Sequence, residues 1–86
     1  MEQGQTLFLT VRNREQLLVN EEIDSLTSYN DKGVFDVLPE HANFISLIRL
    51  FISIKKVGGK TLMIKLDNGI MRVFGKKIDV FLGIKK

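Results

Sequence analysis

Hydrophobic residues recur at every second position in several short segments of this 86-residue chain, and residues that favour turns separate the segments. A period of two is typical of a β-strand that buries one face, because successive side chains point to opposite sides of a sheet. We therefore predict an all-β fold, a small β-sandwich or flattened barrel of about eight to ten short strands. Three segments carry the alternation most plainly: Leu7, Leu9 and Val11; Leu62, Ile64 and Leu66; and Ile78, Val80 and Leu82.

Clusters of glycine, asparagine and aspartate mark the expected turns, because these residues tolerate the positive φ angles of tight turns. The predicted turns cover residues 30–33, 57–60, 67–69 and 75–77. Pro39 cannot donate a hydrogen bond to a sheet, so it is expected to end the strand before it.

Two longer stretches are expected to form two strands each. In residues 17–29, the acidic pair Glu21-Glu22 is predicted to separate a short strand that begins at Leu17 from a second strand. Residues 44–56 also fit helical spacing, but their β-branched content and the lack of a helix stop signal favour two strands joined by a bend.

The size and composition predict one globular domain over residues 1–86. The chain is 44% hydrophobic and 27% charged and contains no cysteine, which excludes disulfides, thiolate metal sites and cysteine nucleophiles. Its first ten residues lack the pattern of a secretory signal. The longest apolar stretch, residues 44–52, is too short to span a bilayer and includes Arg49. We expect a cytoplasmic protein.

Charge is unevenly distributed along the chain. Through Ile48 there are eight acidic and three basic residues, whereas from Arg49 onward there are ten basic and two acidic residues. A basic surface with exposed aromatic rings can bind single-stranded nucleic acid. The alternative function is therefore that of a small basic β-barrel that binds single-stranded nucleic acid. Lysines that keep strand edges soluble would give the same pattern. Phe8 and Phe81 lie opposite the predicted core face of their strands, which suggests that a protein partner covers them.

The sequence offers no constellation for catalysis, for a metal or for a cofactor. His41 is the only histidine, and nothing in its spacing from Asp36 and Ser46 requires the three side chains to converge. Scattered carboxylates with one histidine do not make a metal site. Residues 58–61 look superficially like a phosphate-binding loop, but the first glycine of that motif is missing, so a hairpin turn is the preferred interpretation. We predict no catalytic, metal-binding or cofactor-binding residue.

Residues 33–42, Gly-Val-Phe-Asp-Val-Leu-Pro-Glu-His-Ala, resemble without a gap the most recognisable stretch of the epsilon subunit of F-type ATP synthases. Residues 7–11 resemble the opening strand of that family, and residues 67–73 resemble one of its hairpins. The chain is thus similar to the N-terminal β-sandwich domain of the family over nearly its whole length. It departs from the family pattern at Val34, where an acidic residue is common.

The resemblance implies a non-catalytic subunit of the central stalk, which couples the gamma subunit to the membrane c-ring during ion-driven ATP synthesis. It implies a loop facing the c-ring, made of Asp31, Lys32, Gly33, Val34 and Phe35, and a set facing gamma, made of Arg12, His41 and Ser46. The subunit would lie peripherally on the inner face of the cell membrane, with no direct insertion into it. The family generally adds a C-terminal pair of helices, which we expect to be absent from this chain because it ends where that pair would begin. The chain is then either a naturally short form or an isolated domain.

Overall fold

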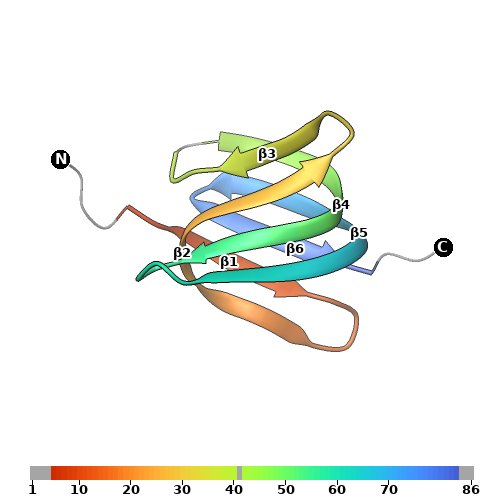
Figure 1. Cartoon of the computed structure of the whole chain (residues 1–86), viewed down its shortest axis with the longest axis horizontal. Coiled ribbons are helices and arrows are strands. Elements are labelled where there is room, and N and C mark those ends of the chain that lie inside the picture. Colours follow the sequence, from red (N-terminus) through yellow and green to blue (C-terminus); the bar gives the residue numbers. More distant parts are fainter. Residues whose placement is uncertain (1–4, 41, 84–86) are drawn as a thin grey trace.

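The computed structural model describes residues 5–40 and 42–83, and in these ranges six β-strands form a sheet that closes on itself (Figure 1). The strands are β1 (Leu7–Arg12), β2 (Leu17–Asn30), β3 (Gly33–Val37), β4 (Ala42–Lys56), β5 (Thr61–Gly75) and β6 (Lys77–Leu82). Their order is β1-β6-β5-β4-β2-β3, and a further pairing of β1 with β2 closes the barrel. This confirms the predicted all-β flattened barrel. Within the two described ranges, no helix is long and apolar enough to cross a membrane.

The core fills the space inside the barrel, and every strand contributes to it. The alternation predicted for β1 and β6 is confirmed, because every second residue of each strand is buried. Each fully buried valine, leucine, isoleucine or methionine side chain contributes roughly 1.5–3 kcal/mol to the free energy of folding. The buried hydrophobic residues are Leu7, Leu9, Val11, Val19, Ile23, Leu26, Val37, Ile48, Ile52, Ile54, Met71, Val73, Ile78, Val80 and Leu82.

Strand β2 corrects the prediction of two strands in residues 17–29. It runs unbroken through the acidic pair, because Glu21 and Glu22 pair with Leu9 and Phe8 of β1. Near Ile23 the strand exchanges one neighbour for another, pairing with β1 on one side of this point and with β4 and β3 on the other. The polar residues therefore mark a change of partner rather than a turn.

Strands β4 and β5 correct two further predictions at one place. Residues 44–56 form a single strand, and residues 67–69 do not turn the chain. Ile48 pairs with Gly69 and Leu50 with Leu66, so Asp67 and Asn68 together lie opposite Arg49. Two residues opposite one make a β-bulge, which bends both strands. Because each expected break is a bend inside a longer strand, there are six strands rather than about eight to ten.

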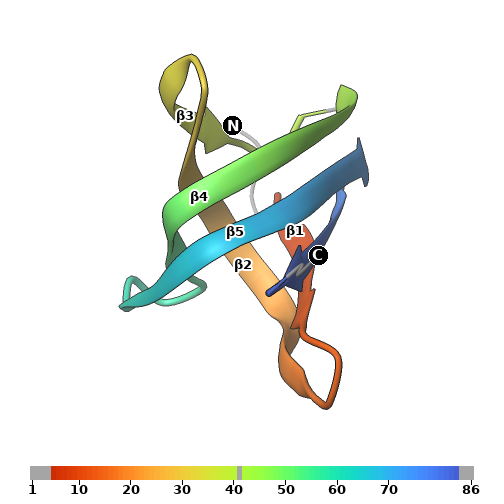
Figure 2. The ribbon, with the colours of Figure 1, turned by 90° about the vertical axis from the view of Figure 1, so that its right-hand side faces the viewer.

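The remaining predicted turns are confirmed. Residues 31–32 connect β2 to β3, residues 57–60 connect β4 to β5, and Lys76 connects β5 to β6. Gly58 and Gly59 have φ angles of 99° and 100°, a region that residues with a Cβ rarely adopt. Figure 2 shows that the β2–β3 hairpin and the β1–β2 turn lie at opposite ends of the molecule.

Candidate docking surfaces

A row of exposed hydrophobic residues crosses the outside of β4, β5 and β6. Leu47 pairs with Ile70, and Ile70 pairs with Phe81, so the three side chains are direct neighbours on one face. All three are exposed, Leu47 by 72%, because the residues adjacent to them in each strand pack towards the core. We call Leu47, Ile70 and Phe81 the apolar stripe. A contiguous exposed apolar row is typical of a surface that another molecule covers.

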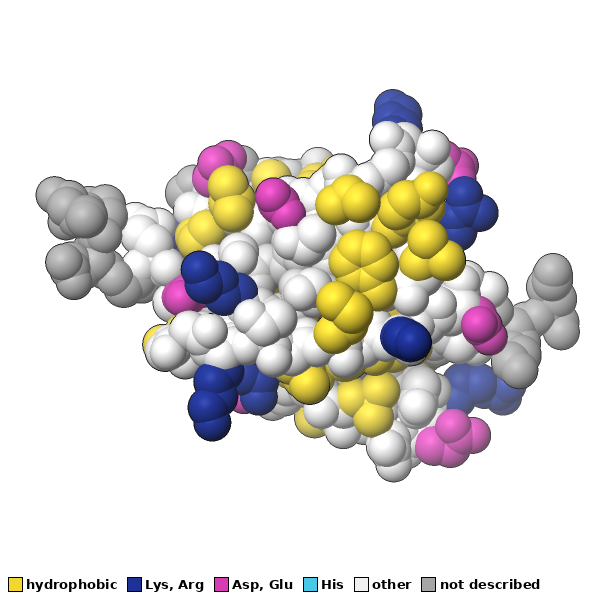
Figure 3. Space-filling model, in the orientation of Figure 1, with side chains coloured by type: hydrophobic (Ala, Val, Ile, Leu, Met, Phe, Trp, Pro, Cys, Tyr) yellow, Lys and Arg dark blue, Asp and Glu magenta, His cyan; other side chains and the backbone are white. Residues whose placement is uncertain are grey.

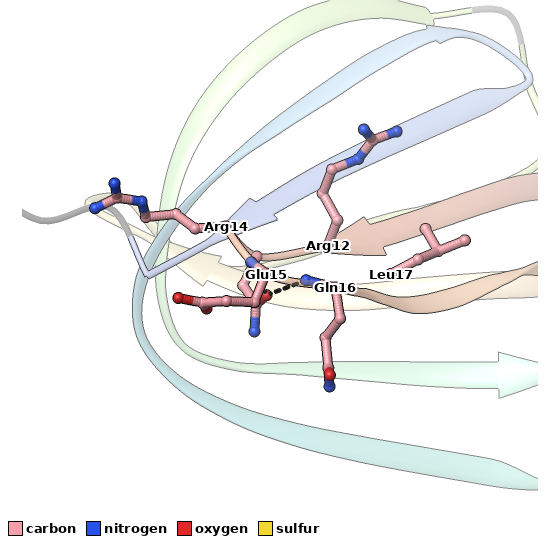
Figure 4. A pocket seen from close by; sticks show the side chains of 6 residues that line it. Arg12, Arg14, Glu15, Gln16 and Leu17 are labelled. Carbon is pink, nitrogen blue, oxygen red and sulfur yellow. Dashed lines mark hydrogen bonds between the residues drawn. The ribbon is translucent and has the colours of Figure 1, made fainter.

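Arg12 extends this row on β1, where it pairs with Phe81. It is the last residue of its strand and lies beside a hydrogen-bonded turn. In this turn the Asn13 side-chain oxygen accepts hydrogen bonds from the backbone nitrogens of Glu15 and Gln16 at 2.9 and 2.8 Å. Figure 4 shows the guanidinium groups of Arg12 and Arg14 pointing away from each other around the hollow at this turn. Among the described residues, no carboxylate forms an ion pair with Arg12.

Arg72 lies on the same outer face, one row further along β5. Its guanidinium is 3.9 Å from the Asp79 carboxylate, and its guanidinium carbon is 5.8 Å from the centre of the Phe74 ring. Shallow hollows of about 510 and 320 Å³ flank it, one reaching Ile45 and Phe74 and the other reaching Phe81. The face therefore combines apolar depressions with fixed charge, as protein interfaces do.

A second apolar surface lies near the β2–β3 hairpin. Val34 of β3 pairs with Tyr29 of β2 and is 64% exposed, and Leu50 at the β4 bulge is 54% exposed. Figure 3 shows hydrophobic side chains gathered over the end of β2 and the bend of β4. We call Tyr29, Val34, Leu50 and the half-buried Phe51 the hairpin patch.

The five loop residues predicted to face the c-ring lie in this hairpin but do not all point outwards. Asp31 and Lys32 form the exposed turn, and Gly33 and Val34 begin β3. Phe35 instead packs against the core, with its ring centre 6.4 Å from that of Phe44. The exposed residues of the predicted loop are therefore Asp31, Lys32 and Val34, whereas Gly33 and Phe35 are partly buried.

The residues predicted to face gamma are not gathered into one compact site. Arg12 and Ser46 lie on strands that are three spacings apart across the sheet, roughly 14 Å at the usual strand separation. The Ser46 hydroxyl is half-buried and accepts a hydrogen bond from the Asn30 side chain at 3.0 Å. His41 lies outside the described residues.

Sequence reasoning missed the apolar stripe except for Phe81. A signal was present, because the apolar run of residues 44–52 is longer than burial of one strand face requires, and such runs indicate cover on both faces. The apolar run could not show which residues lie beside Leu47, since that depends on the register between β4 and β5.

These surfaces are of the kind through which proteins dock onto one another. In the part of the chain that the structure describes, no group of three or more histidine, cysteine, aspartate or glutamate residues could hold a metal ion. Asp36 and Ser46 are the two residues that a catalytic set with His41 would need. They form separate hydrogen bonds, the Asp36 carboxylate with the Thr27 hydroxyl and the Ser46 hydroxyl with the Asn30 side chain. What the fold offers instead is a closed barrel with two apolar patches.

The chain belongs to the family described as the ATP synthase, Delta/Epsilon chain, beta-sandwich domain, whose match spans residues 6–82. It is 33% identical over 72 residues to the ATP synthase epsilon chain of Carboxydothermus hydrogenoformans, covering 84% of this chain and 54% of that one. It is 29% identical over 75 residues to the ATP synthase epsilon chain of Nitratidesulfovibrio vulgaris strain Miyazaki F, covering 87% of this chain and 56% of that one. The chain thus spans about half the length of these relatives.

The fold is also that of a chain in the cryo-EM structure of the Euglena gracilis mitochondrial ATP synthase, with a TM-score of 0.84 at 18% identity over 95% of this chain and 53% of that one. Membership of the family does not favour the alternative of a barrel that binds single-stranded nucleic acid. The predicted absence of a C-terminal pair of helices concerns residues beyond the family match and stays a prediction.

Proposed function

We propose that the chain is the docking domain of an ATP synthase epsilon subunit, a non-catalytic part of the central stalk that couples the gamma subunit to the c-ring during ion-driven ATP synthesis. Family membership supports this role, and the observation that carries it is the pair of separate apolar surfaces on one closed barrel. A coupling part needs two contacts on a body that does not deform between them. Six strands hydrogen-bonded into one closed sheet around a close-packed core resist such deformation.

The apolar stripe is the proposed contact for gamma, together with Arg12, His41 and Ser46. Interfaces of this kind bury an apolar centre inside a polar rim. Arg12 stands at the rim of the stripe without a carboxylate partner among the described residues, so an acidic group on gamma would pair with it.

The hairpin residues 31–35 are the proposed contact for the c-ring. Because Val34 occupies the exposed position where relatives of this family often carry an acid, the contact made by this chain is apolar at that point, with the charges of Asp31, Lys32 and Arg49 around it. In this role the domain would lie in the part of the complex outside the bilayer, on the cytoplasmic side, without inserting into the membrane.

Binding to the gamma subunit tests the first contact. Leu47→Asp places a charge in the apolar stripe at an exposed site where folding tolerates it. We expect gamma to bind this variant about thirtyfold more weakly by calorimetric titration, the loss of roughly 2 kcal/mol that marks an interface hot spot. Met63→Asp is the matched control, because Met63 is 56% exposed on β5 away from the stripe. Equal affinities of the two variants would rule out the stripe as the contact.

Binding of the gamma-bound chain to purified c-ring tests the second contact. Val34→Asp is expected to weaken this binding at least fivefold, because it buries a new carboxylate against the ring. Val57→Asp, at the similarly exposed β4–β5 turn, is the control. If Val57→Asp weakens ring binding as much as Val34→Asp, the hairpin is not the contact.

A further inference from the structure

We propose that Ser46 and Arg49 are positioning residues, which fix the β2–β3 hairpin to β4 so that the hairpin patch moves as one body with the barrel. The inference rests on the proposed function only in naming what the hairpin contacts. The fixing itself follows from contacts among the described residues.

The hairpin needs side chains to hold it, because its backbone is attached on one side only. Strand β3 pairs with β2 alone, at the end of the sheet order. The ladder between β2 and β4 stops at Ser28 and Ile52, so Asn30 and the turn beyond it have no backbone partner in β4. Val37 in the core and the Phe35 ring against Phe44 hold the far end of β3, so the turn end of the hairpin is the part that needs further contacts with β4.

Ser46 holds one side of the hairpin through Asn30. The Asn30 side-chain nitrogen donates to the Ser46 hydroxyl at 3.0 Å, and its oxygen accepts from the Lys32 backbone nitrogen at 2.9 Å. The Ser46 hydroxyl in turn donates to the Leu47 carbonyl at 3.1 Å. One asparagine amide therefore shapes the turn with its oxygen and ties the turn to β4 with its nitrogen.

Arg49 holds the hairpin from the bulge. Its guanidinium carbon is 5.6 Å from the centre of the Tyr29 ring, and one guanidinium nitrogen is 3.9 Å from the Asp31 carboxylate. The ion pair is long and its carboxylate is almost fully exposed, so the stacking on Tyr29 is the stronger of the two contacts. Both contacts lie on the hairpin side of the point where the ladder stops.

The bulge is what brings these two residues to the hairpin. The buried Ser28 hydroxyl donates to the Phe51 carbonyl at 2.9 Å, which binds β4 to β2 just past the last ladder pair. Asp67 and Asn68 together oppose Arg49, so β4 bends at the residue that reaches the hairpin. We call the contacts of Ser46 and Arg49 with Asn30, Tyr29 and Asp31 the hairpin anchor.

Amide hydrogen exchange of the isolated chain, followed residue by residue by NMR, tests the anchor. In the double variant Ser46→Ala/Arg49→Met, the amides of residues 29–35 should exchange about tenfold faster, while those of β1 and β6 keep their rates. A tenfold change corresponds to about 1.4 kcal/mol, which is the size expected for losing one net hydrogen bond and one stacked cation. The control Ser53→Ala/Lys65→Met also removes one serine hydroxyl and one cationic side chain from β4 and β5, at positions whose side chains have no hydrogen bond, ion pair or ring contact to the hairpin among the described residues, and it should leave all rates unchanged.

Two results would overturn the proposal. Unchanged exchange in residues 29–35 of the double variant would show that the anchor holds nothing, and an equal acceleration in every strand would show a role in global stability alone. If the double variant does not fold, the single changes Ser46→Ala and Arg49→Met replace it, with about threefold faster exchange expected for each. Because neither gamma nor the ring is present, failure here leaves the docking assignments standing, and failure of those assignments leaves the anchor standing.

Discussion

Leu50 has a backbone conformation that its side chain disfavours. Its φ angle of 78° lies in the left-handed region, where a Cβ crowds the following carbonyl. The residue sits at the bulge between β4 and β5, and more than half of its side chain is exposed. The bulge geometry is therefore maintained against a local cost by the pairing on either side of it.

Replacing Leu50 by glycine should raise the free energy of unfolding by about 1 kcal/mol, because the strain is removed and little buried area is lost. Thermal or urea denaturation measures this change. Leu47→Gly is the control, since Leu47 is an exposed residue of the same strand without a positive φ, and there glycine should lower stability by roughly 0.5–1 kcal/mol. Destabilisation by Leu50→Gly would mean that contacts of the side chain outweigh the strain.

Gly69 explains why the turn predicted at residues 67–69 was wrong. A Cβ at this position would lie 2.8 Å from the Phe81 carbonyl oxygen, so glycine is needed for the close approach of β6. Its φ is not positive, unlike that of the glycines in the turns. The sequence Asp-Asn-Gly suits both a hairpin turn and a β-bulge, and only the pairing with β4 shows which of the two it forms.

At the scale of elements, local sequence was sufficient where a strand is short and keeps one partner. Strands β1, β3 and β6 and three of the four turns followed from alternation and turn residues alone. Local sequence was insufficient for β2, β4 and β5. Strand β2 continues through polar residues because it pairs with a different strand beyond them, and β4 and β5 continue through a bulge because their pairing resumes in a shifted register. The inward direction of Phe35 and the bond from Asn30 to Ser46 likewise depend on β4, which the predicted loop does not include.

Removal of β6 should abolish cooperative folding. A chain that ends at Lys76 lacks Ile78, Val80 and Leu82, which together contribute roughly 5–9 kcal/mol, comparable to the whole stability of a small domain. It also leaves β1 unpaired on one side. Circular dichroism during heating should show no sharp transition.

Phe81→Ser is the control for this truncation, because it changes the outer face of β6 and keeps the three core residues. This variant should still unfold cooperatively. A sharp transition in the truncated chain would mean that β6 is dispensable for the barrel and that the core is smaller than the burial of its side chains indicates.

At the scale of the whole molecule, the proposed docking surfaces are products of the topology. The row from Arg12 to Leu47 combines residues from the first and last strands of the described chain, because β1 and β6 lie side by side in parallel. Resemblance in the sequence could therefore predict the family of the chain, while the composition of the surfaces became visible only with the register of the strands. The hairpin anchor joins the second surface to the same strand that carries Leu47.

The β4–β5 turn is a suitable place to attach a label to this molecule. Open space surrounds Gly58 and Gly59, and β4 separates them along its length from both the stripe and the hairpin. A fluorescent label attached to a side chain of this turn, such as a cysteine that replaces Lys60, would leave both glycines in place and stay clear of either proposed contact. If the chain has the proposed role, a dye at this turn would report the angular position of the barrel in the assembled complex.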